Sequence, residues 1–345
     1  MSKLPEEICV IGYPSNCGGA DTELLHQIKC WSLMGIKTHI IPTKDNINER
    51  ISLDDCNVVI HDYMDFKSCE GLHTLSFCNP AFLLYAKEIK KYARSTSWAN
   101  CMTFNFITEL HAHEKGYIDY FLYQTKHQYN SLAPWLIKTN SNYIPYQFKP
   151  YFDIFQFPYI DPDDRNYNIV KFGRISRSDI SKFNKHQFYI YKRIQGPKSG
   201  IVLGWDDSMK DKFIPPNEID DCNCVFYKEN EISQQEFYKK CNILCMSTNT
   251  YENLPRVAFE CMASGCLLVV DNRGGWKSVI EHRETGFLCK YPEDFIFTMN
   301  DVCKDIQNLK RIVRNSYSYL LKNFSQQQSA KSWEVFFKTI NARTT

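Results

Sequence analysis

The chain has 345 residues, of which 43% are hydrophobic. It contains 41 basic and 39 acidic side chains, which gives a net charge of +2. At roughly 100–200 residues per domain, this length predicts two domains that each bury a core, and it excludes a small stapled scaffold. Residues 1–150 hold 14 basic and 15 acidic side chains, so neither half is strongly charged. Nucleic acid is therefore an unexpected partner, because domains that bind it are usually strongly basic.

Fifteen cysteines are scattered through the chain, from Cys9 to Cys303. Their number is odd, and MSKLPEE leads directly into the apolar run ICVIGY without a signal peptide. We therefore expect reduced, buried thiols in a cytoplasmic protein. The spacing Cys222-x-Cys224 with Cys241-x3-Cys245 departs from the usual zinc patterns, so no metal site is expected. No apolar stretch reaches the roughly 20 residues of a membrane span.

The first half alternates between apolar runs and helical patterns, which predicts a parallel sheet covered on both faces. The predicted strands are 8–13, 38–43, 57–63, 101–107 and 119–125, and the predicted helices are 19–35, 81–94 and the segment from 126 to Trp135.

The pattern breaks around Tyr143 into a stretch rich in proline and aromatic residues, which favours an ordered crossover between domains. The alternation then restarts with runs at 168–176, 188–194, 200–205 and 223–229, a helix at 234–242, a strand at 243–248, a helix at 255–264, a strand at 266–271, a short helix at 278–282 and mostly helix over 294–323. A final helix at 329–340 carries Trp333, Phe336, Phe337 and Ile340 on one face, which requires a docking surface. The domain boundaries predicted from this pattern are 1–148, with 327–345 packing back on it, and 149–326.

Gly18 and Gly19 lie between the first strand and the first helix. Bare backbone there allows a phosphate to approach a helix N-terminus. The segment is neither G-x-G-x-x-G nor a P-loop, since it lacks the P-loop lysine. A tight turn without a ligand is the alternative reading.

The run NIVKFGRISRSDISKF places Arg174, Arg177 and Lys182 in a predicted loop after a strand that ends at Gly173. Arginine forks and lysine point charges at the mouth of a strand suit a diphosphate. The alternative is a solvated basic loop.

Glu252 and Glu260 stand eight positions apart around Pro255, which is expected at the first position of a helix. Glu252 then lies in the loop before the helix, and Glu260 is the acid of an otherwise apolar segment. One reading is an Arg256/Glu260 surface pair. The other is a carboxylate that accepts hydrogen bonds from a ribose diol, with Glu252 over a reacting sugar. Gly274 and Gly275 form a second bare loop after the strand at 266–271.

Residues 252–288 resemble the donor-site block of the retaining glycosyltransferases of family 4, which have the E-x7-E pattern and the GT-B fold. Residues 18–43 resemble the first loop and helix of that family, and 172–183 resemble its G-R…K diphosphate segment; together they cover about a fifth of the chain. The resemblance implies an α/β fold of two Rossmann-like parallel-sheet domains that face each other across a cleft. Ser278 stands where many relatives carry an acid.

Carried over to this chain, the resemblance implies that Glu260 holds the ribose of a nucleotide and that Glu252 faces the donor sugar. Backbone at Asn253 and Leu254 would contact the sugar and phosphate. The diphosphate would be held by Arg174 and Lys182, with Gly18 and Gly19 closing on it. His111, expected at a strand end, is a candidate for a catalytic contact with the sugar hydroxyls, whereas His113 reads as a surface residue.

The expected activity is a metal-independent, retaining transfer of a sugar from a nucleotide-diphospho-sugar to a hydroxyl acceptor, with no other cofactor. Preorganised cations would stabilise the charge that develops on the leaving diphosphate. Asp161-Pro-Asp163 is the one Asp-x-Asp in the chain, but it lies in the crossover. Two alternatives stay open at this point: a catalytically silent subunit that binds a nucleotide sugar, and a transferase that acts on modified DNA bases. The base and sugar of the donor, the acceptor and the oligomeric state are not encoded in these motifs.

Overall fold

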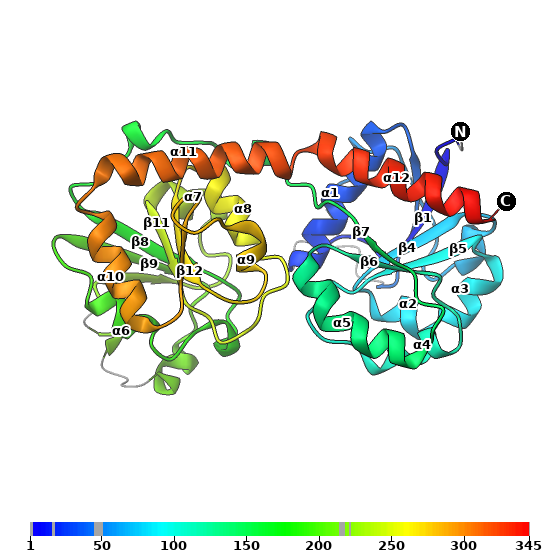
Figure 1. Ribbon diagram of the computed structural model, residues 1–345, viewed down its shortest axis with the longest axis horizontal. Coiled ribbons are helices and arrows are strands. Elements are labelled where there is room, and N and C mark those ends of the chain that lie inside the picture. The colour runs from blue at the N-terminus through cyan, green and yellow to red at the C-terminus, as the bar shows by residue number, and fades with distance from the viewer. Residues whose placement is uncertain (1–2, 16–17, 45–50, 214–217, 221, 345) are drawn as a thin grey trace. The chain divides into compact units, whose positions relative to one another are not determined.

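The computed structural model describes residues 3–15, 18–44, 51–213, 218–220 and 222–344 (Figure 1). It divides the chain into two compact units. Unit 1 comprises Met1–Asp153 and Phe324–Thr345, and unit 2 comprises Ile154–Asn323. The sequence-based boundaries are 148 and 326.

Among its described residues, unit 1 contains a seven-stranded sheet in the order β3-β2-β1-β4-β5-β6-β7, and each neighbouring pair is parallel. Its strands are β1 (Glu7–Ile11), β2 (Lys37–Ile41), β3 (Val58–Ile60), β4 (His73–Phe77), β5 (Ser95–Ala99), β6 (Tyr120–Tyr123) and β7 (Pro145–Gln147). Its helices are α1 (Gly19–Leu33), the 3₁₀ helix η2 (Phe66–Cys69), α2 (Pro80–Leu84), α3 (Ala86–Tyr92), α4 (Ile107–Glu114), α5 (Lys126–Thr139) and α12 (Gln326–Thr344).

Both faces of this sheet are buried, as β1 illustrates. Ile8 and Val10 join one apolar cluster, while Cys9 and Ile11 join a second cluster on the opposite face. Successive side chains of a strand point to opposite faces, and helices cover both sides of a parallel sheet. Because both faces of β1 are buried, all four residues of the run ICVI are hydrophobic.

Helix α12 returns to unit 1 after the chain has completed unit 2. Trp333 is fully buried, and its ring centroid lies 5.1 Å from that of Trp31 on α1 and 5.2 Å from that of Phe148. The indole Nε1 donates to the side-chain oxygen of Gln27. Phe336, Phe337 and Ile340 are buried in the same cluster, so the apolar face of α12 completes the core of unit 1.

Among its described residues, unit 2 contains a six-stranded parallel sheet in the order β10-β9-β8-β11-β12-β13. Its strands are β8 (Val170–Ile175), β9 (Lys198–Leu203), β10 (Cys224–Tyr227), β11 (Ile243–Met246), β12 (Leu267–Asp271) and β13 (Phe287–Cys289). Its α-helices are α6 (Gln187–Lys192), α7 (Gln234–Lys240), α8 (Arg256–Ala263), α9 (Trp276–Val279), α10 (Pro292–Val302) and α11 (Ile306–Asn323). Its 3₁₀ helices are η3 (Ile154–Gln156), η4 (Pro162–Asp164), η5 (Ile180–Lys182) and η6 (Asp207–Lys212).

The two sheets confirm the predicted fold class, but several elements differ from the sequence-based assignment. Residues 101–107 are not a strand, because the chain leaves β5 at Cys101 with a φ of 60° and forms a loop that leads into α4. The strands β4 and β5 are missing from the sequence-based assignment, since HTLSF and STSWA are too polar to read as buried strands. The apolar run at 188–194 forms helix α6.

The described cysteines are free, and most of them are buried. The burial of most of them agrees with the expectation of buried thiols. No helix in the described ranges is long and apolar enough to cross a membrane.

Candidate active site

The strand order of unit 2 defines where a ligand is expected. From β8 the chain proceeds through β9 to β10 at one edge, and then returns to β11 on the other side of β8. Parallel α/β sheets bind ligands outside the carboxyl ends of their strands at such a point of reversal. The segments that follow β8, β11 and β12 therefore form the candidate site, and they carry most of the predicted residues.

Arg174 belongs to β8 itself and not to the loop in which the sequence reading placed it. Its side chain is fully buried, and its guanidinium lies 3.5 Å from the ring centroid of Phe183. Its terminal nitrogens donate to the Gln187 side chain at 3.2 Å and to the Lys182 carbonyl at 2.8 Å. Burial lowers the pKa of Arg174 to about 10, which leaves it charged at neutral pH. Through the Lys182 carbonyl and the Phe183 ring, Arg174 thus holds the backbone of the basic segment after β8 in place.

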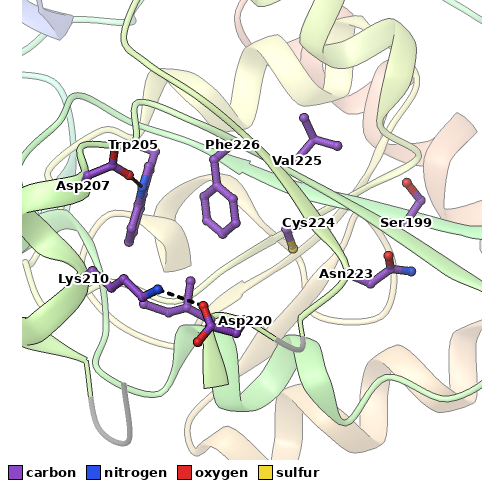
Figure 2. Close-up of a pocket in the computed structure, with 10 residues that line it drawn as sticks. Ser199, Trp205, Asp207, Lys210, Asp220, Asn223, Cys224, Val225 and Phe226 are labelled. Atoms are coloured by element: carbon purple, nitrogen blue, oxygen red, sulfur yellow. Dashed lines mark hydrogen bonds and ion pairs between the residues drawn. The ribbon is translucent and has the colours of Figure 1, made fainter. Parts of the chain in front are cut away.

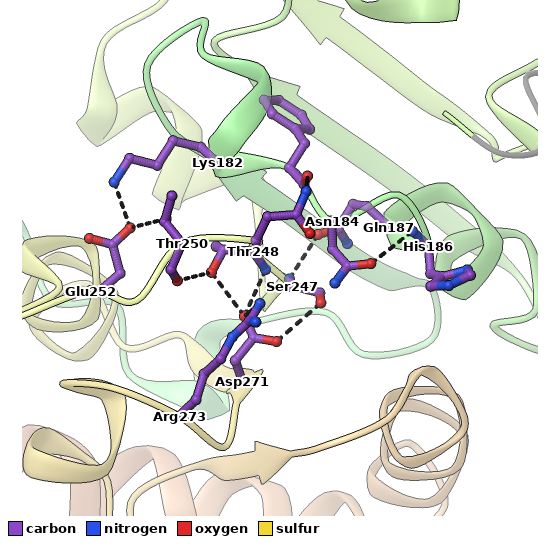
Figure 3. Close-up of polar contacts among 12 residues, drawn as sticks. Lys182, Asn184, His186, Gln187, Ser247, Thr248, Thr250, Glu252, Asp271 and Arg273 are labelled. Atoms are coloured by element: carbon purple, nitrogen blue, oxygen red, sulfur yellow. Dashed lines mark hydrogen bonds and ion pairs between the residues drawn. The ribbon is translucent and has the colours of Figure 1, made fainter. Parts of the chain in front are cut away.

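Lys182 and Glu252 form an ion pair within the site (Figure 3). Lys182 Nζ lies 2.7 Å from Glu252 Oε1, and about a fifth of each side chain is exposed, 21% and 20%. Thr250 Oγ1 contributes a longer contact of 3.4 Å to the same carboxylate oxygen. The residue expected at the diphosphate and the residue expected at the sugar are therefore partners in the structure.

Asp271 connects the carboxyl ends of β11 and β12 (Figure 3). Its carboxylate accepts hydrogen bonds from Ser247 Oγ at 3.1 Å, from the Thr248 amide at 2.7 Å and from Thr248 Oγ1 at 3.1 Å. Burial raises the pKa of Asp271 above its ordinary value. This network holds the two strand ends together.

Glu260 lies in the second turn of α8 and is 6% exposed. Tyr238 OH, from α7, donates to Glu260 Oε2 at 3.1 Å. Burial raises the pKa of Glu260 to about 7. Arg256 is also buried, so the two residues are not the surface pair that the sequence left open. Pro255 occupies the N-cap position, one residue before the first helical position at which it was expected.

Two glycines bring the loop after β12 against the loop that carries Glu252. A Cβ added to Gly275 would lie 1.6 Å from the carbonyl oxygen of Asn253, and one added to Gly274 would lie 2.8 Å from that of Glu252. The Gly275 amide donates to the Glu252 carbonyl at 2.7 Å. Only residues without a side chain permit this approach, which fixes the backbone of Glu252.

A cavity of about 510 Å³ lies beside β9 and the edge strand β10 of the same unit (Figure 2). Trp205 Nε1 donates to Asp207 Oδ1 at 2.9 Å, and Lys210 pairs with Asp220 at 2.8 Å at its rim. Its lining contains none of the predicted site residues; it consists of Ser199, Trp205, Asp207, Lys210, Ile219, Asp220, Asn223, Cys224, Val225 and Phe226.

Residues 219–319 match the model of the family Glycosyl transferases group 1. The matched stretch, which includes Glu252, Glu260 and the glycine pair, is therefore similar to the domain of that family. It is similar to an uncharacterized glycosyltransferase of Haemophilus influenzae, with 31% identity over 104 residues that span 30% of this chain and 26% of that protein. It is also similar to spore coat protein SA of Bacillus subtilis, with 27% identity over 110 residues, 31% of this chain and 29% of that protein.

The match to solved structures extends over nearly the whole chain. A structure of Anabaena HepE in complex with UDP and glucose superposes with a TM-score of 0.75 at 14% identity, covering 97% of this chain and 100% of that one. Sucrose-phosphate synthase from Thermosynechococcus elongatus gives 0.73 at 12% identity, covering 98% and 100%. The fold is GT-B, as predicted.

Gly18 and Gly19 belong to unit 1 of this GT-B chain. Gly18 precedes α1 with a φ of 99°, and nothing lies within 4 Å of the Cβ that a larger residue would have. Asp21 occupies the first turn of the helix and accepts a hydrogen bond from Ser15 Oγ at 2.6 Å. The α1 N-terminus therefore already faces a carboxylate of its own.

His111 does not lie at a strand end, because it belongs to helix α4. The side chain is 66% exposed, and its Nδ1 lies 3.8 Å from Glu114 Oε2. His113, read as a surface residue, is instead buried, and its Nε2 contacts the Leu136 carbonyl at 3.1 Å. The structure adds no contact that supports a catalytic role for His111, and that role stays a prediction.

No group of three or more His, Cys, Asp or Glu residues in the described ranges is arranged to hold a metal ion. Asp161 and Asp163 of the Asp-x-Asp triplet instead pair with Arg314 and Lys310, each at 2.8 Å.

Sequence reasoning missed two functional candidates in unit 2, Asp271 and Arg273. They flank Asn272 in the segment VVDNRGG, directly at the end of β12. The signal that was available is the strand-to-glycine transition, since charged residues at the carboxyl end of a parallel strand point to a ligand site.

Proposed function

We propose that this protein is a retaining glycosyltransferase that moves a sugar from a nucleotide-diphospho-sugar to a hydroxyl acceptor without a metal ion. The observation that carries the proposal is the contact between Lys182 and Glu252 at the carboxyl ends of the unit 2 strands. It brings a cation suited to a diphosphate next to a carboxylate suited to a sugar. The UDP complexes of the Anabaena neighbour support a nucleotide-bound donor of this type.

Different residues bind the three parts of the donor, which are the ribose, the diphosphate and the sugar. Glu260 accepts the hydrogen bonds of the ribose diol, a task that suits a carboxylate held by Tyr238 at the floor of the site. Lys182 turns from Glu252 to the diphosphate, supported by Arg174 beneath it and by backbone of Asn253 and Leu254 at the N-terminus of α8. Unpaired N–H groups and the positive end of the dipole make a helix N-terminus favourable for phosphate.

In the reaction, the bond between the anomeric carbon and the diphosphate oxygen breaks, and its electron pair leaves with the nucleoside diphosphate. The acceptor oxygen forms the new bond on the same face, and its proton passes to the departing phosphate oxygen. Cations fixed before the reaction stabilise the negative charge that grows on the leaving group. Glu252, freed from Lys182, faces the positively charged sugar. His111 stays the candidate for contacting the sugar hydroxyls, and Gly18 and Gly19 stay candidates for the diphosphate.

A thermal-shift panel tests the proposal. UDP-, GDP-, ADP- and dTDP-sugars are each added with and without EDTA, because a ligand that binds the folded state raises the melting temperature by mass action. We expect one nucleotide class to stabilise the protein, equally in both conditions. A shift that disappears with EDTA would refute metal independence, and stabilisation without donor consumption would favour a silent nucleotide-sugar-binding subunit.

A further inference from the structure

Arg273 is a cation of the site with unused hydrogen-bonding capacity. It stands two residues after Asp271, where β12 ends, and its side chain is 28% exposed. Its Nε and Nη2 atoms are buried and have no hydrogen-bond partner. Asp271 Oδ2 lies 3.6 Å from Nη2, which is beyond the range of a normal hydrogen bond.

The neighbouring carboxylate is occupied by other donors. Asp271 accepts three hydrogen bonds, from Ser247 Oγ and from the amide and hydroxyl of Thr248. Figure 3 shows the Arg273 side chain running alongside Asp271 toward Thr248. The ion pair between Arg273 Nη2 and Asp271 therefore neutralises charge but leaves Nε and Nη2 without a hydrogen bond.

The position of Arg273 is fixed relative to Glu252. The next two residues are the glycines that pack on the backbone of Glu252 and Asn253, and the Arg273 guanidinium carbon lies 5.7 Å from the ring centroid of Tyr251. A ligand that binds Glu252 therefore lies close to the loop that carries Arg273.

Lys182 and Arg174 are engaged with the protein. Lys182 pairs with Glu252, and both terminal nitrogens of Arg174 donate to protein acceptors, so that only its Nε lacks a partner. Arg273 instead offers Nε–H and Nη2–H, which point to the same side of the planar guanidinium. This fork matches two oxygens of a carboxylate or a phosphate.

We propose that the Nε–Nη2 edge of Arg273 binds a two-oxygen anionic group of the donor. The group is either the phosphate next to the sugar or a carboxylate carried by the sugar itself. The inference rests on the proposed function and adds a subsite to it. The competing account is that Arg273 only balances the charge of Asp271.

Calorimetry on four proteins tests this subsite. The wild-type protein is titrated with UDP, GDP, ADP and dTDP, and then with the glucose and glucuronate esters of the nucleotide that binds. Arg273→Ala, Arg273→Lys and the control Lys277→Ala follow with the same ligands. Lys277 is exposed and lies four residues further along the same segment, so its removal changes the net charge equally. Thermal melts without ligand confirm that each variant is folded.

If the anion is the phosphate, Arg273→Ala weakens all three ligands by at least about tenfold, the value of a charge-assisted fork, and Lys restores only part of the loss. If the anion is a sugar carboxylate, the same loss is confined to the glucuronate ester. Should Arg273→Ala bind every ligand as Lys277→Ala does, the subsite is disproved while the proposed function stands. A wild-type protein that binds none of the nucleotides would overturn both.

Discussion

Lys182 Nζ lies 2.7 Å from Glu252 Oε1, so the two residues expected to hold the diphosphate and the sugar satisfy each other in the free protein. About a fifth of each side chain is exposed, so a ligand can reach both partners and replace each of them. The pair keeps a lysine and a carboxylate in place until a donor provides a phosphate for one and a sugar for the other.

Replacing Glu252 with Gln removes the competitor for Lys182. We expect Glu252→Gln to bind the nucleoside diphosphate alone as tightly as the wild type or severalfold more tightly, and to lose most of its transferase activity. Lys182→Ala should weaken the same ligand by at least about tenfold, since it removes a charge-assisted contact. Calorimetry and a turnover assay on both variants separate the two effects. Equal weakening by both changes would contradict the exchange of partners.

Nucleotide affinity should depend on pH through Glu260. Burial raises the pKa of this carboxyl group from 4.5 to about 7, so its protonated form is populated at neutral pH and below. A folded-state pKa above the unfolded value means that the group stabilises the fold most below the unfolded value, and that this contribution is lost as the pH rises through 7. A ribose diol donates two hydrogen bonds, which favours the ionised form, so affinity should rise between pH 6 and pH 8.

Glu260→Gln is the control for this pH dependence. The amide cannot ionise, so the variant should bind weakly and with no slope between pH 6 and pH 8. Burial also raises the pKa of Glu109 in unit 1 to about 7, and a slope that persists in Glu260→Gln would assign the titration to that or another group.

The contact of Gly275 with Asn253 predicts a steric effect on binding. Gly275→Ala places a carbon where the Asn253 carbonyl oxygen lies, at 1.6 Å, and the φ of −66° is acceptable for alanine, so the effect is purely one of space. The Glu252 loop must shift, and we expect nucleotide-sugar binding to fall by at least about tenfold, because a displacement of about 1 Å disrupts positioning. Lys277→Ala serves as the matched control and should bind normally.

Trp333 predicts a large effect on the stability of unit 1. Trp333→Ala empties a site packed by Trp31, Phe148 and Phe337, and should lower the free energy of unfolding by about 3–5 kcal/mol. Val335 lies on the same helix with 58% exposure, and Val335→Ala should change stability by less than about 0.5 kcal/mol. Urea unfolding of both variants measures the difference. A similar loss in the two variants would mean that α12 is not docked through its aromatic face.

The sequence predicted the fold where hydrophobic runs were unbroken. The strands β1, β8, β11 and β12 are mostly apolar and were assigned close to their true bounds. β4 and β5 were not predicted because they contain several serines and threonines, whose hydroxyls are buried and hydrogen-bonded. Ser76 Oγ donates to the Ile11 carbonyl at 3.0 Å, and Thr96 Oγ1 donates to the Tyr117 carbonyl at 2.8 Å. Such pairing depends on strands that are distant in sequence.

The sequence predicts the site residues that belong to a local motif. It does not predict those whose position depends on how distant segments pack. Glu252 and Glu260 follow from a helix start, and the structure places Lys182 against Glu252. Arg174 was assigned to an exposed loop, although the strand continues through it and buries it. Asp271 and Arg273 carry no spacing signal, because their chemistry comes from the meeting of β11 and β12.

The central claim is most directly tested by following an anomerically pure donor by proton NMR with the wild-type protein. The account predicts slow release of the sugar from one nucleotide-diphospho-sugar without an acceptor, with the anomeric configuration retained in the first product. Addition of EDTA should leave the rate unchanged. Release with inverted configuration would contradict the retaining mechanism, and no consumption of UDP-, GDP-, ADP- or dTDP-sugars would contradict the assignment as a glycosyltransferase.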